Sequence, residues 1–349
     1  PAPMDHTNIS VNYSDQWLEL DHPENDEVFM QNCRQAMMTG EPGFSFNFGD
    51  QAKFTGRNAC TEFITDKDSD ACNLGSVNMS RVHSLTRFAE VCVLASKFLY
   101  CGTCRALTPT EKIAQVRDEN RRIGLGLMGV HEWLLRRGMP YEVTDELRQW
   151  LAIYEIESQT GANEVANRLG LPLPAAYRAI APTGTIGTYA GTTTGIEPIF
   201  APAYKRRYRV GMQHHFQFVV DPTAKAIAEE CGLDPDGFEC SLDLAAAFER
   251  RIAFQADIQG YVDMGISSTV NLPRWGSDDN NEDLVGSFAS VLARYAPRLR
   301  GITFYPDGSR GGQPLESVPY SEAIQHVGQS FVEEVADVCD LSGRGSCNN

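Results

Sequence analysis

The sequence predicts an α/β fold built on a mostly parallel sheet. Segments with the apolar spacing of helices alternate with short segments rich in β-branched and aromatic residues, which is typical of βα units. No internal repeat or low-complexity linker interrupts this alternation, and 42% of the 349 residues are hydrophobic, enough for a sizeable core. We therefore expect one domain over residues 1–330, followed by a flexible tail at 331–349.

A helix and a strand are the first elements that the pattern predicts. The apolar positions within residues 28–37 lie on one helix face, and Gly40 follows as a closing residue. The segment 43–48, GFSFNF, indicates a strand. Thr110 suits the N-cap of a later helix. Further helices are expected at 82–99, 110–137, 144–169, 222–231, 242–264 and 282–295, and further strands at 177–184, 267–272 and 301–305.

The charge and hydropathy patterns exclude two classes of function. A net charge of −16 argues against a nucleic-acid surface, which needs clustered positive charge, and no apolar run is long enough to span a membrane. One basic run, Lys205-Arg206-Arg207 with Arg209, is either a solvated charge run or attracts a polyphosphate. Ten cysteines at irregular spacing favour a reducing, cytoplasmic location and catalytic thiols.

Two cysteine motifs have structural interpretations. Cys33 lies on the apolar face of the first predicted helix, so we expect a core thiol there. Cys101 and Cys104 have the CxxC spacing of redox or zinc sites at the end of a helical run. Because no second ligand pair accompanies them, a packed helix end is favoured over zinc, and we expect no metal site.

The most informative segment is Asn58-Ala59-Cys60-Thr61-Glu62, with Cys72 twelve positions after Cys60. In an extended loop the amide, thiol and carboxylate at alternate positions would project to one side. A carboxylate can abstract a proton, an amide can fix a hydroxyl, and a thiol can carry a one-electron hole or form a disulfide. These groups suit acid–base chemistry combined with dithiol reduction.

A second motif, APTGTIGTYAGTTTGIEPIF, covers residues 181–200 and contains four glycines among its threonines. Glycine lets the backbone approach a ligand closely, and amide N–H groups in such turns bind phosphate oxygens.

Together the two motifs resemble the ribonucleotide reductase large subunit, most closely its adenosylcobalamin-dependent type. Four further stretches fit that family: TGEPGFSF, RRIGLGLMG, GISSTVNLP and GITFYPDGSRGGQPL. The resemblance implies a ten-stranded α/β barrel with a central finger loop that carries Cys60, and this chain would form its C-terminal part. It also implies reduction of ribonucleoside di- or triphosphates to deoxyribonucleotides.

The resemblance assigns a role to each motif residue. Cys60 is expected to form the thiyl radical that abstracts the 3′ hydrogen of the ribose, with Glu62 as base on the 3′-hydroxyl and Asn58 as its hydrogen-bonding companion. Cys72 resembles one of the two thiols that reduce the 2′ position. Cys339 and Cys347 resemble the tail dithiol that thioredoxin or glutaredoxin recharges. The substrate phosphates are expected at Thr183, Gly184, Thr185, Ile186 and Gly187.

Three questions stay open at this level. The family partner of Cys72 would lie before Asn8, so the chain resembles a truncated enzyme or one product of a split gene, or an inactive complementation fragment. The diiron-dependent branch uses two adjacent tyrosines in a late strand, whereas here Phe304 precedes Tyr305, which favours adenosylcobalamin as cofactor. The sequence does not show whether the substrate is a diphosphate or a triphosphate. It also does not show which allosteric effector binds or what the oligomeric state is.

Overall fold

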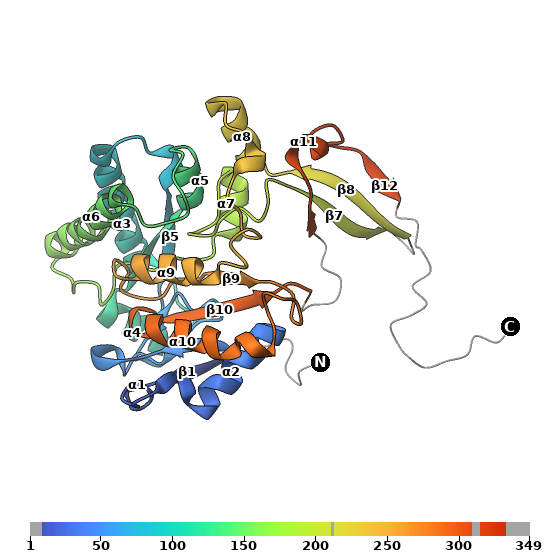
Figure 1. Cartoon of the computed structure of the whole chain (residues 1–349). Coiled ribbons are helices and arrows are strands. Elements are labelled where there is room, and N and C mark those ends of the chain that lie inside the picture. The colour runs from blue at the N-terminus through green and yellow to red at the C-terminus, as the bar shows by residue number, and fades with distance from the viewer. Residues whose placement is uncertain (1–8, 211–212, 309–314, 333–349) are drawn as a thin grey trace.

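The computed structural model describes residues 9–210, 213–308 and 315–332. Its centre is a row of mostly parallel strands with helices packed against it, which confirms the predicted α/β class (Figure 1). At one end of the row β5 (Asn73–Asn78) pairs in parallel with β6 (Ile123–Met128). Isolated parallel bridges then join Leu125 to Arg178 and Ile180 to Ile266.

The other end of the row contains the strands nearest the two ends of the described chain. β9 (Thr269–Leu272) lies parallel to β10 (Gly301–Pro306). β10 in turn pairs antiparallel with β2 (Gly43–Phe46), which is parallel to β1 (Ser10–Tyr13). The row therefore contains two groups of parallel strands that run in opposite directions and meet between β10 and β2.

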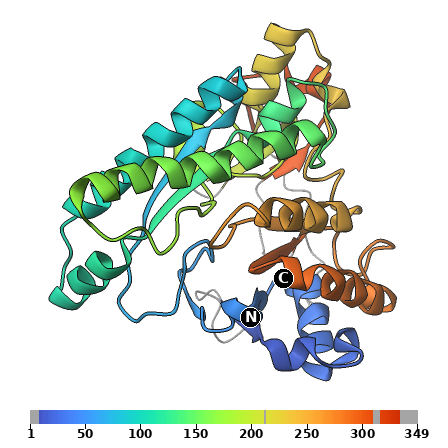
Figure 2. The same cartoon turned by 90° about the vertical axis from the view of Figure 1, so that its left-hand side faces the viewer.

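Two long helices cover one part of this row. α3 (Leu85–Arg105) and α6 (Asp145–Leu169) lie side by side and pack against β5 and β6 (Figure 2). The fit is close, because a Cβ on Gly161 of α6 would lie 2.3 Å from the carbonyl oxygen of Val93. Ser84 and Thr144 cap the two helices by accepting hydrogen bonds from backbone amides.

A second hydrophobic core packs α2 (Glu27–Thr39) and α10 (Val285–Tyr295) against β2 and β10. Phe44, Phe288 and Phe304 form edge-to-face contacts in it, with ring centroids 4.9 to 5.7 Å apart. Cys33 is fully buried in this core, as predicted. Gly40 follows α2 with φ 85°, which confirms the predicted helix end.

The remaining elements surround the row. An antiparallel sheet, β11-β7-β8-β12, extends to one side of it and was not predicted from the sequence (Figure 1). Its strands are β7 (Ala203–Val210), β8 (Gln213–Val220), β11 (Leu315–Ser317) and β12 (Ser330–Val332). The other helices are α1 (Asp15–Leu18), α4 (Glu111–Asn120), α5 (Val130–Leu135), α7 (Gly184–Ala190), α8 (Pro222–Cys231), α9 (Phe248–Gln259) and α11 (Tyr320–Ala323). Within the described ranges, every helix is too short or too polar to cross a bilayer.

The predicted helix at 110–137 is wrong. Thr110 does cap a helix, but α4 ends at Asn120, and Arg121 takes a left-handed conformation with φ 40°. The buried strand β6 follows, and then the short helix α5. A run of buried apolar residues has no polar face to reveal its period, so spacing could not separate this strand from a helix.

Two other predicted boundaries also change. The helix expected at 242–264 forms only at α9, because turns occupy the residues before it. The strand expected at 177–184 contributes only the isolated bridges at Arg178 and Ile180. α8, α10, β9 and β10 lie close to the predicted positions.

A buried histidine fixes the downstream end of the Gly/Thr segment. His131 of α5 is 1% exposed and accepts a hydrogen bond at Nδ1 from the backbone N–H of Ile199, 3.0 Å away. Burial, with a further contribution from the charge of Arg251, lowers the pKa of His131 from 6.5 to about 3. The fold therefore requires a neutral imidazole here.

Acid should destabilise the protein through His131. Between pH 6.5 and about 3 the unfolded chain binds a proton on this ring that the folded chain does not, so lowering the pH through this window favours unfolding. The loss is at most about 1.4 kcal/mol per pH unit. His131→Asn keeps an acceptor for Ile199 but does not titrate. Urea unfolding at pH 5, 6 and 7 should give a shallower pH dependence for the variant, and equal slopes would contradict the assignment.

Candidate functional site

The Asn58–Glu62 segment forms the tip of a short hairpin. β3 (Gly56–Arg57) pairs antiparallel with β4 (Ile64–Thr65), and the residues between them make a tight turn rather than the extended loop that we expected. Thr61 has φ 64°, and its backbone N–H donates to the Asn58 carbonyl over 3.1 Å. The turn still brings the Asn58 and Glu62 side chains together.

The amide and the carboxylate form a direct pair. Asn58 Nδ2 donates to Glu62 Oε1 over 2.7 Å, while Asn58 Oδ1 accepts from the backbone N–H of Phe63 over 3.2 Å. Glu62 is only 3% exposed, and its second oxygen, Oε2, is buried without a hydrogen-bond partner among the described residues. One carboxylate oxygen is thus held in place and the other retains its capacity to accept a hydrogen bond or a proton.

The Cys60 thiol lies between these two residues in the sequence and is exposed. Partial burial and the negative charge of Glu62 both raise its pKa, so the thiol form is favoured near neutral pH. A neutral thiol next to a carboxylate is suited to hydrogen-atom chemistry and less suited to nucleophilic attack, which requires the thiolate.

Cys72 is a second, more deeply buried thiol directly before β5. Burial raises its pKa to about 12; nearby Arg122 opposes this, while Asp70 and Glu62 raise it further. Arg122 forms an ion pair of 3.0 Å with Asp70, and both side chains are almost fully buried. Because Glu62 influences both, the predicted radical thiol Cys60 and the predicted redox thiol Cys72 lie within electrostatic reach of the same carboxylate.

Gly265 seats the hairpin tip against the strand row. Its backbone N–H donates to the Glu62 carbonyl over 2.9 Å, and a Cβ here would lie 2.2 Å from the carbonyl oxygen of Thr61. No side chain can occupy that space, so glycine is required. Gly265 opens the motif GISSTVNLP, but its role was not predicted from the sequence. A glycine beside a strand is the signal for such a close backbone approach.

The Gly/Thr segment begins with a left-handed residue and a short helix. Thr183 has φ 52°, is buried, and accepts a hydrogen bond at Oγ1 from the backbone N–H of Gly195 over 2.8 Å. α7 follows, with Gly184, Thr185 and Ile186 exposed in its first turn and Gly187 buried against Thr194. The first amides of a helix have no partner within it, so these three N–H groups are available to an anion.

Backbone hydrogen bonds connect the Gly/Thr segment to the hairpin tip. Ile180 donates to the carbonyl of Gly265 over 3.2 Å, and Ser267 donates back to Ile180 over 2.8 Å. Gly265 also holds Glu62, as described above. The structure thus links the segment that precedes Thr183 to the loop that carries Cys60 through a single strand.

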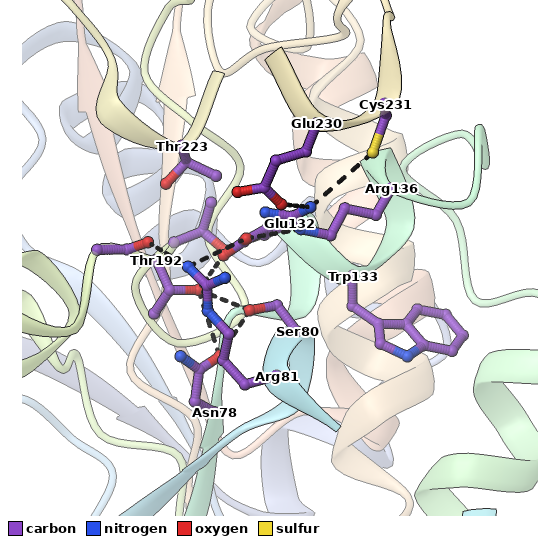
Figure 3. Close-up of polar contacts among 12 residues, drawn as sticks. Asn78, Ser80, Arg81, Glu132, Trp133, Arg136, Thr192, Thr223, Glu230 and Cys231 are labelled. Carbon is purple, nitrogen blue, oxygen red and sulfur yellow. Dashed lines mark hydrogen bonds and ion pairs between the residues drawn. The ribbon is translucent and has the colours of Figure 1, made fainter. Parts of the chain in front are cut away.

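A buried carboxylate that we did not predict holds the middle of the Gly/Thr segment (Figure 3). Glu132 of α5 is fully buried and accepts hydrogen bonds from Thr192 Oγ1 at 2.5 Å and Arg136 Nε at 2.8 Å. Arg81 contributes a weaker ion pair at 3.8 Å. Asn78, at the end of β5, accepts from Thr192 over 3.4 Å. Glu132 therefore ties the segment to the carboxyl ends of two parallel strands.

Glu197 provides a second unpredicted anchor. It forms an ion pair with Arg251, which is only 2% exposed, and accepts a hydrogen bond of 2.7 Å from the backbone N–H of Thr269 in β9. Sequence spacing cannot reveal such pairs, because the partners are far apart in the chain and neither lies in a local motif.

Other predicted site residues do not join this cluster. Cys339 and Cys347 lie outside the described residues. In the basic run, Lys205 packs over the Phe216 and Phe218 rings and Arg207 pairs with Glu316 over 3.1 Å. Among the residues that the structure describes, no three His, Cys, Asp or Glu side chains are arranged to hold a metal ion.

Comparison with known proteins identifies the family. Residues 24–170 and 174–296 match the family described as ribonucleotide reductase, barrel domain, and these residues make up most of the chain. The chain belongs to the ribonucleotide reductase family. The α/β row is accordingly part of the family barrel, and the hairpin of β3 and β4 is the predicted finger loop that carries Cys60.

Relatives of this reductase-family chain include enzymes with a named cofactor. The chain is 28% identical over 383 residues to a vitamin B12-dependent ribonucleoside-diphosphate reductase of Mycobacterium tuberculosis. The match covers 91% of this chain and 54% of the relative. The chain is 26% identical over 389 residues to a putative adenosylcobalamin-dependent ribonucleoside-triphosphate reductase of Mycobacterium phage D29, covering 95% and 55%. The chain thus spans about half the length of these relatives.

The fold agrees with a solved structure of the same family. The crystal structure of a B12-dependent, class II ribonucleotide reductase superposes with a TM-score of 0.71 at 17% sequence identity, covering 91% of this chain and 49% of that one. At this identity the likeness concerns the fold alone.

The Glu62→Gln variant should make Cys60 more reactive. Removing the carboxylate charge lowers the pKa of the thiol, so alkylation by iodoacetamide at pH 7 to 8 should become several-fold faster. Tryptic mapping follows Cys60 in the peptide 58–67. Cys231, which is exposed elsewhere, serves as an internal control and should react at an unchanged rate. An unchanged rate at Cys60 would show that Glu62 does not influence this thiol.

Proposed function

We propose that the chain forms the C-terminal catalytic portion of an adenosylcobalamin-dependent ribonucleotide reductase, which reduces ribonucleotides to 2′-deoxyribonucleotides for DNA synthesis. One observation carries the proposal: an exposed Cys60 thiol next to a buried Glu62 carboxylate that Asn58 holds by one oxygen. The names of the curated relatives support both the reaction and the cofactor.

The three residues divide the chemistry at the ribose. Cys60, as a thiyl radical, takes the hydrogen atom from the 3′ carbon and becomes a thiol. Glu62 accepts the proton of the 3′-hydroxyl through Oε2, which has no partner among the described residues. Asn58 keeps the carboxylate in the turn through the 2.7 Å hydrogen bond to Oε1. The 2′-hydroxyl leaves as water with a proton from a thiol of the redox pair, and Cys60 finally returns its hydrogen atom to the 3′ carbon.

Two electrons must then reach the 2′ position. Cys72 supplies one of the two thiols, and its high pKa keeps it protonated until it reacts. We place its disulfide partner in an N-terminal portion of the enzyme, by the family resemblance. Cys339 and Cys347, within the tail at 331–349, are proposed to reduce the resulting disulfide and to be recharged by a protein of the thioredoxin or glutaredoxin class. We place the reaction in the cytoplasm.

Adenosylcobalamin fits the exposed side of the hairpin tip. The Cys60 thiol is exposed while Glu62 is buried, so a bulky cofactor can approach the sulfur without displacing the carboxylate. When bound, the cofactor supplies the radical that oxidises Cys60, which amino-acid side chains alone do not generate. Two alternatives to this proposal remain. The chain could belong to a reductase class that pairs with a diiron subunit, or it could be an inactive complementation fragment without enzymatic function.

The substrate phosphates are proposed to bind at the start of α7. The backbone amides of Thr183, Gly184, Thr185, Ile186 and Gly187 belong to this turn. Gly184, Thr185 and Ile186 are exposed, and the strand that contains Gly265 connects the turn to the Cys60 loop. Diphosphate and triphosphate substrates both suit such a turn.

The Cys60→Ser variant tests the reaction. With adenosylcobalamin, a dithiol and the N-terminal portion supplied in trans, the unmodified chain should form deoxyribonucleotide from a ribonucleoside di- or triphosphate. The serine hydroxyl cannot form the radical, so turnover should fall below about a hundredth, as when a reacting group is lost. Glu62→Gln should bind nucleotide but lose turnover.

Cys231→Ser is the matched control, because this thiol is exposed at the end of α8 and belongs neither to the hairpin nor to the turn at the start of α7. It should retain full activity. Deoxyribonucleotide formation by Cys60→Ser at more than a few per cent of the unmodified rate would overturn the proposal. Activity with a diiron subunit and none with adenosylcobalamin would select the alternative class.

The Gly184→Val variant tests the phosphate turn. A Cβ at Gly184 meets no atom within 4 Å, and valine is a better helix former than glycine, so the substitution should change the free energy of unfolding by less than about 1 kcal/mol. It should nevertheless weaken nucleotide binding about tenfold or more, because the side chain projects where the phosphate must approach. Equilibrium binding and thermal unfolding separate the two effects. Unchanged affinity would place the phosphates elsewhere.

A further inference from the structure

The last turn of α3 carries two thiols that the proposed reaction does not use. Cys101 is exposed, whereas Cys104 is half-buried and packs against the hydrophobic core. Residues three apart on a helix project to the same side, so the two sulfurs share one face. Gly102 lies between them, and a Cβ there would touch only the Asn73 side chain, at 3.8 Å.

Arg121 contacts the inner thiol. Its Nη1 atom lies 3.2 Å from Cys104 Sγ, while Nη2 pairs with Asp118 over 3.4 Å. Arg121 is 8% exposed, so the guanidinium is held beside the sulfur within the fold. This contact fixes the position of the inner sulfur on the helix face, where it can reach a mixed disulfide formed at Cys101.

The surroundings favour dithiol chemistry over metal binding. Within the described part of the chain no third histidine, cysteine or carboxylate completes a metal site at this pair. The geometry is also close to that of a disulfide: Cβ atoms three residues apart on a helix lie about 5 to 6 Å apart, and a disulfide needs about 3.5 to 4.5 Å. The last turn of a helix, with glycine inside it, can supply that adjustment.

We propose that Cys101 and Cys104 form a redox-active dithiol that exchanges with an external disulfide of the glutathione type. The Cys101 thiolate attacks the external disulfide, forms a mixed disulfide and releases one thiol. Cys104 then attacks Cys101 Sγ, closes the intramolecular disulfide and releases the second thiol. The pair loses two electrons and two protons, and the external disulfide gains both. Reduction follows the same path in reverse, with Cys104 leaving first.

The position of the pair gives the exchange a structural consequence. Thr103, between the two cysteines, accepts a hydrogen bond of 3.1 Å from Asn73 Nδ2, and Asn73 directly follows Cys72 at the start of β5. Closing a disulfide around Thr103 therefore alters the helix turn that supports this strand. The dithiol is therefore a second redox site. Asn73 connects it to Cys72, the thiol proposed to react at the ribose.

The test uses the full chain in buffers of reduced and oxidised glutathione and needs no reductase activity. After acid quenching and alkylation, trypsin releases both thiols in one peptide, 98–105, because Lys97 and Arg105 flank them. We expect this peptide to become unalkylated and lighter by two hydrogen atoms as the oxidised fraction rises. Fragment-ion sequencing should show that Cys231, exposed and 3.9 Å from Arg136 Nη1, forms only a mixed disulfide.

Three variants sharpen the result. Cys104→Ser should trap glutathione on Cys101, and Cys101→Ser should leave Cys104 several-fold slower to react because it is half-buried. Arg121→Gln removes the guanidinium that holds Cys104 Sγ in place, so closure from the mixed disulfide should slow several-fold. A thioredoxin-type protein in place of glutathione shows whether a protein disulfide is also accepted. A peptide that carries only glutathione, or that stays fully alkylated across all buffers, would overturn the proposal.

Discussion

The site depends on one close backbone contact, between Gly265 and the hairpin tip. A Cβ at this position would lie 2.2 Å from the Thr61 carbonyl oxygen, and the Gly265 N–H holds the Glu62 carbonyl at 2.9 Å. This contact fixes the depth of the Cys60 loop in the barrel. The Gly265 carbonyl also accepts a hydrogen bond from the Ile180 N–H, so the same residue positions the strand that leads to the proposed phosphate turn. An alanine here would displace both parts of the site at once.

Paired buried charges hold the elements around this contact. Arg178 is 2% exposed, forms an ion pair of 2.7 Å with Asp263, and hydrogen-bonds the Tyr261 carbonyl over 2.8 Å. Glu132 and Arg251 have similar roles at Thr192 and Glu197, in the second half of the Gly/Thr segment. Such pairs add little net stability, since desolvation offsets their attraction, but breaking one leaves an uncompensated charge. They therefore select one arrangement of the loops.

The sequence predicted local elements better than contacts between them. Asn58 and Glu62 could be expected to meet because they lie within five residues of each other, and the structure pairs them, while the roles of these residues and of Cys60 stay predictions. α2 and α6 could be placed because each has one apolar face and a clear cap. β6 was missed because it is buried on both faces and so lacks a polar face. Its glycines have a contact explanation, since a Cβ on Gly126 would lie 2.6 Å from the Ala179 carbonyl. Glu132 could not be found, because a single carboxylate in an apolar helix has no local pattern.

The antiparallel junction between β10 and β2 also determines how the barrel can be entered. β5, β6 and β10 run in one direction and β2 runs in the other, so their carboxyl ends lie at opposite mouths of the barrel. The chain leaves β2 at one mouth of the barrel and soon forms the hairpin. α7 begins at the other mouth, beyond the carboxyl end of the strand at Arg178–Ile180. The Cys60 loop and the proposed phosphate turn thus approach each other from opposite mouths. On the proposed assignment of the site, a nucleotide would enter and leave at the α7 mouth while the hairpin stays seated, so each exchange of ligand would leave Cys60 in place.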